Sequence, residues 1–169
     1  MSWSRRHILL ALAALPGCGF TPVYAPGSAA SALDGQIAIA LIPGGLGFAL
    51  RERLQERLGR VETAPLLLEI DLDLDSEGRV ITEDNRITRY TLTGEAPWRI
   101  VAGNQVVMEG RALSVTAWSA TAAPFATRQA EEDAYRRLAI SLAEKISLEI
   151  AARAGEIPPE ALSAAPQGL

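Results

Sequence analysis

Histidine, cysteine and lysine are nearly absent from this chain. Its 169 residues include one histidine and one cysteine, and Lys145 is the single lysine. Because His7 and Cys18 both lie near the N-terminus, the rest of the chain lacks the side chains that most often act as general bases, nucleophiles or soft metal ligands. Lys145 lies four residues before Glu149, a spacing that predicts an ordinary surface ion pair on a helix. We therefore predict a protein that is not an enzyme and has no cofactor.

Long hydrophobic runs and the spacings of common ion sites are also missing. Beyond the N-terminus, no apolar stretch approaches the roughly 18–20 residues that a helix needs to cross a bilayer. Acidic residues in 68–75 (LEIDLDLD) alternate with apolar ones, so neighbouring carboxylates on one strand face lie about 7 Å apart. These acids could attract a divalent cation, but that separation is too large to chelate one ion without further ligands, and we expect a solvated strand face without a metal site. The net charge of −4 argues against nucleic acid as a partner.

Residues 1–17 have the layout of a bacterial export signal. Arg5 and Arg6 form a positive start, and residues 8–15 (ILLALAAL) form an apolar segment that is too short to span a membrane. The sequence that follows, Leu-Pro-Gly-Cys at 15–18, resembles a lipobox, where a lipoprotein signal is cut after its cysteine receives a diacylglycerol. The paired arginines fit both the general secretory route and the twin-arginine route, and the sequence leaves this choice open.

Cys18 is the predicted lipidation site and the first residue of the mature chain. The alternative is a buried apolar thiol, since free cysteine is often buried. Acyl chains would anchor the protein stably, because each buried methylene contributes about 0.8 kcal/mol. By resemblance to enterobacterial sorting, a residue other than aspartate after the cysteine, here Gly19, implies transfer to the outer membrane. We therefore expect a lipid-anchored protein on the periplasmic side of the outer membrane.

The first half of the mature chain predicts a tether followed by three elements. Residues 18–34 contain prolines and small residues and are the predicted lipidated tether. Residues 36–42 (QIAIALI) predict a strand. Leucines at every fourth position predict an amphipathic helix over 46–58, which Gly59 ends. The alternation in 68–75 predicts a half-buried strand.

The second half predicts a long hairpin and a long helix. Residues 85–101 and 105–118 read as two strands joined by a short turn, with Gly94 and Pro97 marking a bulge or an edge. The apolar residues of 125–153 fall within one arc of a helix.

Together these elements predict an α+β fold. The expected architecture is a two-layer sandwich in β-α-β-β-β-α order, with two helices packed on one face of a mostly antiparallel four-stranded sheet. Residues 35–155 would form this single domain, and residues 156–169 would form a flexible C-terminal tail. The other face of the sheet would be free to meet something else.

Four arginines in the predicted hairpin are candidate binding residues. If they gather on or beside the open face of the sheet, their guanidinium groups could hold phosphate groups through paired hydrogen bonds. Acidic residues nearby, Glu83, Asp84, Glu95 and Glu109, could instead pair with them on the surface, and both readings stay open. The four arginines are Arg86, Arg89, Arg99 and Arg111.

The sum of these features resembles the lipopolysaccharide-assembly lipoproteins of the LptE type. The resemblance rests on the lipobox running into Cys-Gly-Phe-Thr-Pro-Val-Tyr at 18–24, the element order, the long Arg- and Thr-rich central strand and the Ala-rich final helix. It implies a non-enzymatic outer-membrane lipoprotein that plugs a large β-barrel, helps it assemble and can bind lipopolysaccharide directly. In this chain only arginines such as the four above could supply the basic lipid-binding residues.

A second function class fits the same anchor and size. The alternative is an auxiliary lipoprotein of a lipid-transport ATPase complex in the periplasm, which would bind lipid or a periplasmic partner. The two hypotheses differ in the expected partner, a large barrel in the first and an ATPase-linked complex in the second.

Overall fold

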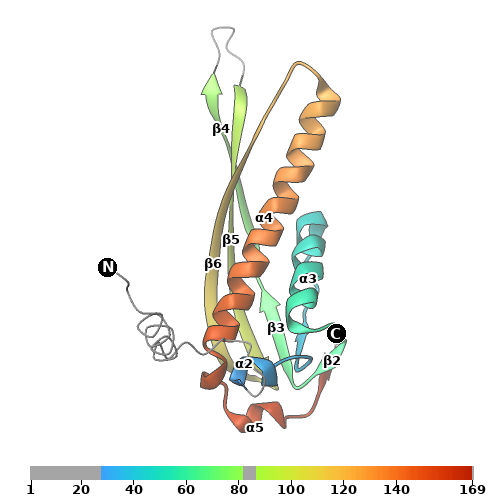
Figure 1. Ribbon diagram of the computed structural model, residues 1–169, viewed down its shortest axis with the longest axis vertical. Helices are drawn as coiled ribbons and strands as arrows, with labels where there is room; N and C mark the ends of the chain where they lie inside the picture. The colour runs from blue at the N-terminus through green and yellow to red at the C-terminus, as the bar shows by residue number, and fades with distance from the viewer. Residues whose placement is uncertain (1–27, 82–86, 169) are drawn as a thin grey trace, which may run out of the picture.

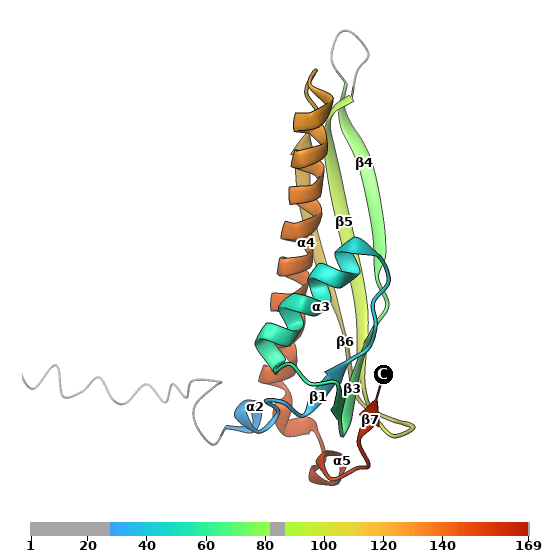
Figure 2. The same ribbon diagram turned by 90° about the vertical axis from the view of Figure 1, so that its right-hand side faces the viewer.

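The structure, a computed structural model, describes residues 28–81 and 87–168. Figure 1 shows an elongated molecule in which a long helix, α4 (Pro124–Ala152), lies along the strands of a sheet. Figure 2 shows that α4 and a second helix, α3 (Gly44–Leu58), lie on the same side of that sheet. The predicted α+β class and its two layers are therefore present.

The main sheet has five strands. They are β1 (Ile37–Ile39), β3 (Leu66–Ile70), β4 (Asp73–Ile81), β5 (Ile87–Ala102) and β6 (Gln105–Ser119). β5 is central: β3 and β4 pair with one of its edges and β6 pairs with the other, all antiparallel, whereas β1 pairs with β3 in parallel. The prediction of a mostly antiparallel four-stranded sheet is therefore corrected to a mixed sheet of five strands.

The additional strand arises because the predicted strand over 68–75 is divided into β3 and β4. Both keep the same register along β5, since Ile70 lies opposite Trp98 and Asp73 lies opposite Glu95. Between them, the Asp71 amide nitrogen donates to the Pro97 carbonyl at 3.0 Å. Proline has no N–H with which to return this bond. Pro97 therefore interrupts the pairing of the neighbouring strand, while β5 itself continues through it.

The two strands predicted over 85–118 form the hairpin of β5 and β6, but its register shift lies between Ile100 and Val101 and not at Gly94 or Pro97. Its two strands are joined at Gly103 and Asn104, where Gly103 has a φ of +60° that glycine adopts without strain. Near the other end, Tyr90 stacks on Trp118 of the partner strand with ring centroids 5.1 Å apart. The ring centroid of Tyr135 in α4 lies 6.3 Å from that of the same Trp118. One aromatic pair thus joins the two strands, and the other joins the sheet to the helix.

Small residues in the middle of the hairpin allow α4 to approach the sheet closely. A Cβ atom added at Gly94 would lie 2.8 Å from Cδ2 of Leu138 in α4. One added at Gly110 would lie 2.6 Å from Oε1 of Glu149 in α4 and 2.5 Å from the Trp98 ring of β5. Both positions therefore exclude a side chain at the present helix distance. Ala96, Ala112 and Ser114 are buried on the same side of the hairpin.

The hydrophobic core lies between this side of the sheet and the two helices. The four leucines of α3 that the sequence predicted to be buried, Leu46, Leu50, Leu54 and Leu58, are all buried. Leu138, Leu142, Ile146 and Ile150 of α4 are fully buried against them and the strands. The four-residue period of each helix therefore identifies its buried stripe correctly.

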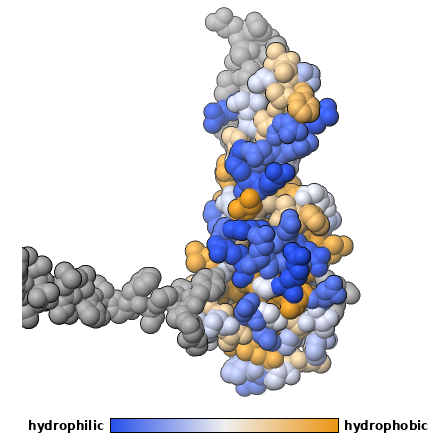
Figure 3. Space-filling view, turned by 45° about the vertical axis from the view of Figure 1, so that its right-hand side comes forward, coloured by the Kyte–Doolittle hydropathy of each residue, from blue (hydrophilic) through white to orange (hydrophobic). Residues whose placement is uncertain are grey.

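Ion pairs join α3 to α4 above this core. Glu144 of α4 accepts hydrogen bonds from Arg53 at 2.5 and 3.0 Å and also from Arg57. The hydrogen bonds from Arg57 and Arg53 lower the pKa of the Glu144 carboxyl. Figure 3 shows hydrophilic residues gathered over the middle of the helical side of the molecule.

Both ends of the described chain pack on the domain. Residues 29–32 form the short helix α2 (Ala29–Ala32), with Ser28 as its N-cap and Ala30 buried, so the predicted tether is folded here. Beyond α4, the chain forms α5 (Pro159–Leu162), and β7 (Gln167–Gly168) pairs with β2 (Thr63–Ala64). Because Ile157 and Ala161 are buried, residues 156–168 are not the flexible tail that the sequence predicted.

Three basic side chains of α4 and its C-terminal end cover the outer edge of β6. Arg137 donates to the Ala117 carbonyl at 3.2 Å, Lys145 donates to the Leu113 carbonyl, and Arg153 donates to the Glu109 carbonyl at 2.8 Å. These side chains recur every eight residues along the helix, and the carbonyls recur every four residues along the strand. The two spacings agree because eight helical residues rise about 12 Å and four strand residues about 13 Å.

The predicted pairing of Lys145 with Glu149 is therefore wrong. Lys145 reaches across to the strand, and Glu149 pairs with Arg153 at 3.2 Å instead. A four-residue spacing on a helix allows an ion pair but does not exclude competition from a neighbouring strand.

The close approach of α4 leads to a first prediction. Gly110→Ala should lower the free energy of unfolding by about 1–3 kcal/mol, because the buried Trp98 ring must move to admit the new methyl group. Gly45→Ala is the matched control: nothing lies within 4 Å of its added Cβ in α3, and alanine favours helix, so it should stabilise by about 0.5–1 kcal/mol. Urea unfolding of the mature chain measures both changes. Equal stability of the Gly110→Ala and wild-type chains would contradict the packing argument.

The junction of α3 and α4 leads to a second prediction, on pH. A carboxyl with a lowered pKa in the folded state stabilises the fold above its ordinary value, here 4.5, and loses that contribution as the pH falls through the folded value. The wild-type chain should therefore lose stability between about pH 5 and pH 3 more steeply than Glu144→Gln. Thermal unfolding across this range tests the difference, with Glu132→Gln on an exposed part of the same helix as control. Parallel pH profiles for wild type and Glu144→Gln would rule out the contribution.

Candidate functional site

The side of the sheet opposite α4 has no helix over it, and we call it the open face. Even-numbered residues of β5, such as Gly94, face α4. Successive side chains of a strand point to opposite sides, so the odd-numbered residues of β5 lie on the open face. Their directly opposed partners in β6 and β4 lie there too, which places Arg99 with Glu109 and Glu95 with Leu113.

An open groove of about 960 Å³ lies on this face. It crosses β3, β5 and β6, and its end is formed by the chain that follows β1. Arg99 and Arg111 are two of its lining residues, together with Glu69, Asp71 and Glu109. The structure therefore brings two of the four predicted arginines together at one feature.

Each of these two arginines holds a carboxylate. Arg99 Nε donates to Oε2 of Glu69 on β3 at 2.5 Å, and a guanidinium nitrogen of Arg111 lies 2.8 Å from Oε1 of Glu95. The arginine side chains remain 59% and 69% exposed in these pairs. Exposed ion pairs contribute only about 0–1 kcal/mol, so a competing anion could replace either carboxylate at small cost.

Acidic groups outnumber basic groups around the groove. Two guanidinium groups face four carboxylates, those of Glu69, Asp71, Glu95 and Glu109. Glu109 lies directly opposite Arg99 in the strand register. Of the acids expected to pair with the arginines, Glu95 pairs with Arg111, whereas Arg99 pairs with Glu69, which lies outside the expected set.

The other two predicted arginines are not part of this group. Arg89 is exposed on the same face opposite Ser119, but it lies ten residues from Arg99 along β5, on the order of 30 Å away. Arg86 lies outside the described residues, as does the predicted lipidation site Cys18. The four arginines therefore do not form one cluster within the part of the chain that the structure describes.

Apolar side chains complete the open face beside the charged groove. Leu113 and Val115 of β6 are 51% and 58% exposed, and Leu41 at the end of the groove is 76% exposed. The face therefore offers cations, carboxylates and hydrocarbon within a few residues of one another. Such a surface suits an amphiphilic ligand better than a purely polar or a purely apolar one.

The acidic residues on the neighbouring strands are spread along an exposed surface. Among the residues that the structure describes, no group of three or more His, Cys, Asp or Glu side chains could hold a metal ion. Asp71, Asp73 and Asp75 are exposed. Within the same described residues, no helix has the length and apolarity to cross a bilayer.

Comparisons with known proteins agree with this fold. A family model described as "LptE: Lipopolysaccharide-assembly" matches residues 35–150. No curated protein matches the chain.

Two solved structures share the architecture. A protein of Caulobacter crescentus CB15, described as a candidate lipoprotein, superposes with a TM-score of 0.59 at 24% identity, covering 75% of this chain and 96% of its own. The rare lipoprotein B of Shewanella oneidensis superposes with a TM-score of 0.51 at 12% identity, covering 69% of this chain and 92% of its own. At these identities the two structures show a common fold. The family model covers most of the chain, which therefore belongs to the LptE family of lipopolysaccharide-assembly proteins.

Proposed function

We propose that this protein is an outer-membrane lipoprotein that plugs and helps assemble a large β-barrel, through which lipopolysaccharide is inserted into the outer membrane. The observation that carries the proposal is the match to the lipopolysaccharide-assembly family over residues 35–150. The lipobox supports it, because acyl chains on Cys18 would hold the domain at the membrane.

The shape and surface of the domain suit the lumen of a barrel. α4 has 29 residues, which gives a helix of about 43 Å, and the sheet runs alongside it for a similar length (Figure 1). Charged side chains cover the helical side, and the open face carries ion pairs. The walls of a large barrel lumen are polar as well, so the charged surfaces of this narrow two-layer domain could face them.

The open face is the proposed contact for lipopolysaccharide. A lipopolysaccharide phosphate would compete with Glu69 and Glu95 for the guanidinium groups of Arg99 and Arg111, which bind phosphate through paired hydrogen bonds. Leu113 and Val115 lie on the same face and could contact hydrocarbon. Because carboxylates are in excess around the groove, divalent cations could bridge some of them to phosphate.

Direct lipopolysaccharide binding gives a third prediction. The double variant Arg99→Gln, Arg111→Gln should bind lipopolysaccharide about thirtyfold more weakly, since each of the two lost charged hydrogen bonds costs of order 1 kcal/mol at an exposed site. The opposite double variant, Glu69→Gln with Glu95→Gln, frees both guanidinium groups and should bind more tightly.

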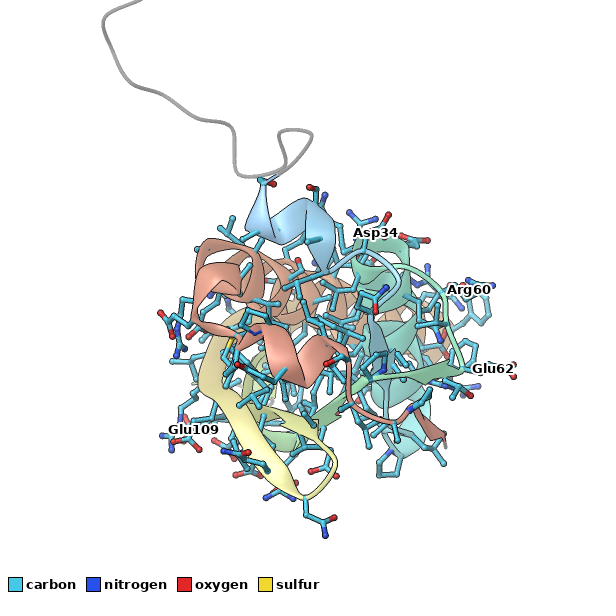
Figure 4. All side chains as sticks on the ribbon, turned by 90° about the horizontal axis from the view of Figure 1, so that it is seen from below. Asp34, Arg60, Glu62 and Glu109 are labelled. Atoms are coloured by element: carbon cyan, nitrogen blue, oxygen red, sulfur yellow. The ribbon has the colours of Figure 1, made fainter. Side chains whose placement is uncertain are left out.

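Arg60→Gln is the matched control for this experiment. Figure 4 shows Arg60 and Glu109 on opposite sides of the molecule, with Arg60 directed away from the body. Binding of fluorescent lipopolysaccharide to the purified mature chain measures all variants. Unchanged affinity in both double variants, or equal loss in Arg60→Gln, would exclude this face as the binding site.

The barrel partner gives a fourth prediction. Affinity purification of the tagged chain from detergent-solubilised outer membranes should recover a large barrel protein in stoichiometric amount. Mass spectrometry of the same material should show acyl chains on Cys18. Recovery of a periplasmic ATPase-linked complex instead would favour the alternative function, and an unmodified Cys18 thiol would remove the proposed anchor.

A further inference from the structure

The two outer edges of the sheet differ in how their backbone groups are satisfied. On β6, Arg137, Lys145 and Arg153 donate to three outward carbonyls. β4 forms the opposite edge over the upper part of the sheet, where β5 is its hydrogen-bonded strand neighbour. Natural sheets commonly protect exposed edges with charged side chains, so an unprotected edge is a place where another strand can pair.

The hydrogen bonds of β3 and of Asp71, which precede β4 in the same register along β5, show which groups of β4 face outward. Asp71 donates its N–H to Pro97 of β5, which indicates that the odd-numbered residues of this strand edge face β5. The even-numbered Leu66 and Leu68 bond instead to the chain of β1, at 3.2 and 2.9 Å. β1 ends at Ile39, and the same edge continues beyond it.

Leu74 and Ser76 are the next outward positions along this edge. By the same alternation, the N–H and C=O groups of both residues point away from β5. No described residue donates to or accepts from these backbone groups. We call residues 73–76 the β4 edge. Its outward N–H and C=O groups are arranged like those groups of β3 that bond to the chain of β1.

The side chains of the β4 edge carry uncompensated negative charge on one face and an apolar group on the other. Asp73 lies directly opposite Glu95 of β5, and that carboxylate pairs with Arg111 of β6, which leaves Asp73 beside an acidic neighbour whose cation lies on the far strand. Neither Asp73 nor Asp75 forms an ion pair with a described residue, and both are exposed on the open face. On the helical side, Leu74 is 38% exposed.

We propose that the β4 edge binds an extended segment of another protein by strand addition, and that this segment alternates basic with apolar residues. Its backbone would pair with Leu74 and Ser76 as a continuation of the edge that β1 occupies. Its basic side chains would lie beside Asp73 and Asp75 on the open face and pair with these two carboxylates. Its apolar side chains would cover Leu74. This inference concerns the strand edge and does not depend on the barrel.

A second copy of the chain is a poor occupant of this edge. Pairing of two β4 edges would bring two rows of aspartates side by side on the same face, and directly opposed like charges destabilise a sheet. Pairing of β4 with β6 of another molecule would have to displace the helix side chains that cover β6. The acidic β4 edge therefore favours a basic partner and disfavours a second copy of this chain.

The test uses the full mature chain in detergent and a ten-residue peptide that alternates arginine with valine. Amide hydrogen exchange, read residue by residue by NMR, should show about tenfold slower exchange at Leu74 and Ser76 when the peptide is bound. The amide of Val115 on the covered β6 edge should change little. A peptide alternating glutamate with valine, and one with its five arginines and five valines in separate blocks, are the matched controls.

Two variants separate the backbone contribution from the charge contribution. Ser76→Pro removes one outward N–H while leaving the bonds to β5 intact, and proline is tolerated at such edges. It should abolish the protection at Leu74, whereas Val115→Pro on the β6 edge should not. Asp73→Asn with Asp75→Asn keeps the backbone and should weaken peptide binding roughly fivefold, as expected for two exposed ion pairs.

Several results would overturn the proposal. One is the absence of protection at Leu74 and Ser76, and a second is equal protection by either control peptide. A third is unchanged peptide binding by the double asparagine variant, which remains a valid test if Ser76→Pro does not fold. Protection of the same amides in a peptide-free dimer would also overturn it, because the occupant would then be a second copy. Barrel recovery is measured separately, so failure here leaves the proposed function standing.

Discussion

Close contact between α4 and the middle of the β5–β6 hairpin is the constraint on which the other parts of the structure depend. Gly94 and Gly110 leave no room for a Cβ, so the helix lies directly on the strands. At that distance its leucines and isoleucines fill the core and its basic side chains reach the outer edge of β6. The same helix holds α3 through Glu144. A larger side chain under the helix would therefore disturb the core, the edge and the second helix together.

The elements with a clear period could be predicted from sequence, and the pairing between distant segments could not. Leucines every four residues located α3, and the turn at Gly103 located the hairpin, because both signals are local. The parallel pairing of β1 with β3 and the division at Pro97 depend on which strand lies beside which. Pro97 acted on its neighbour and not on its own strand, a result that only the register reveals. Residues 156–168 pack through Ile157 and Ala161, too few apolar residues for a periodic signal.

The candidate site was predictable in its residue types but not in its grouping. Placing Arg89, Arg99 and Arg111 on one face follows from the two-residue period of a strand. The distance between Arg89 and Arg99 along β5 follows from the same count, but the ion pairs of Arg99 and Arg111 do not. Glu69 reaches Arg99 because β3 pairs with β5 in a register that brings these two residues opposite each other. The alternating acids of 68–75 were therefore a signal for cross-strand partners as well as for a wet strand face.

The two ends of this elongated domain lie at different distances from the proposed lipid anchor at Cys18. α2 lies at the lower end in Figures 1 and 2, whereas the β4–β5 end lies at the top. Ten residues separate Cys18 from Ser28, and even fully stretched they span no more than about 36 Å. A bilayer-bound cysteine thus keeps the α2 end within that radius of the lipid surface. Because such a tether holds only the α2 end, Arg89 and Arg99, which lie far apart on one strand, could reach different distances from the lipid surface.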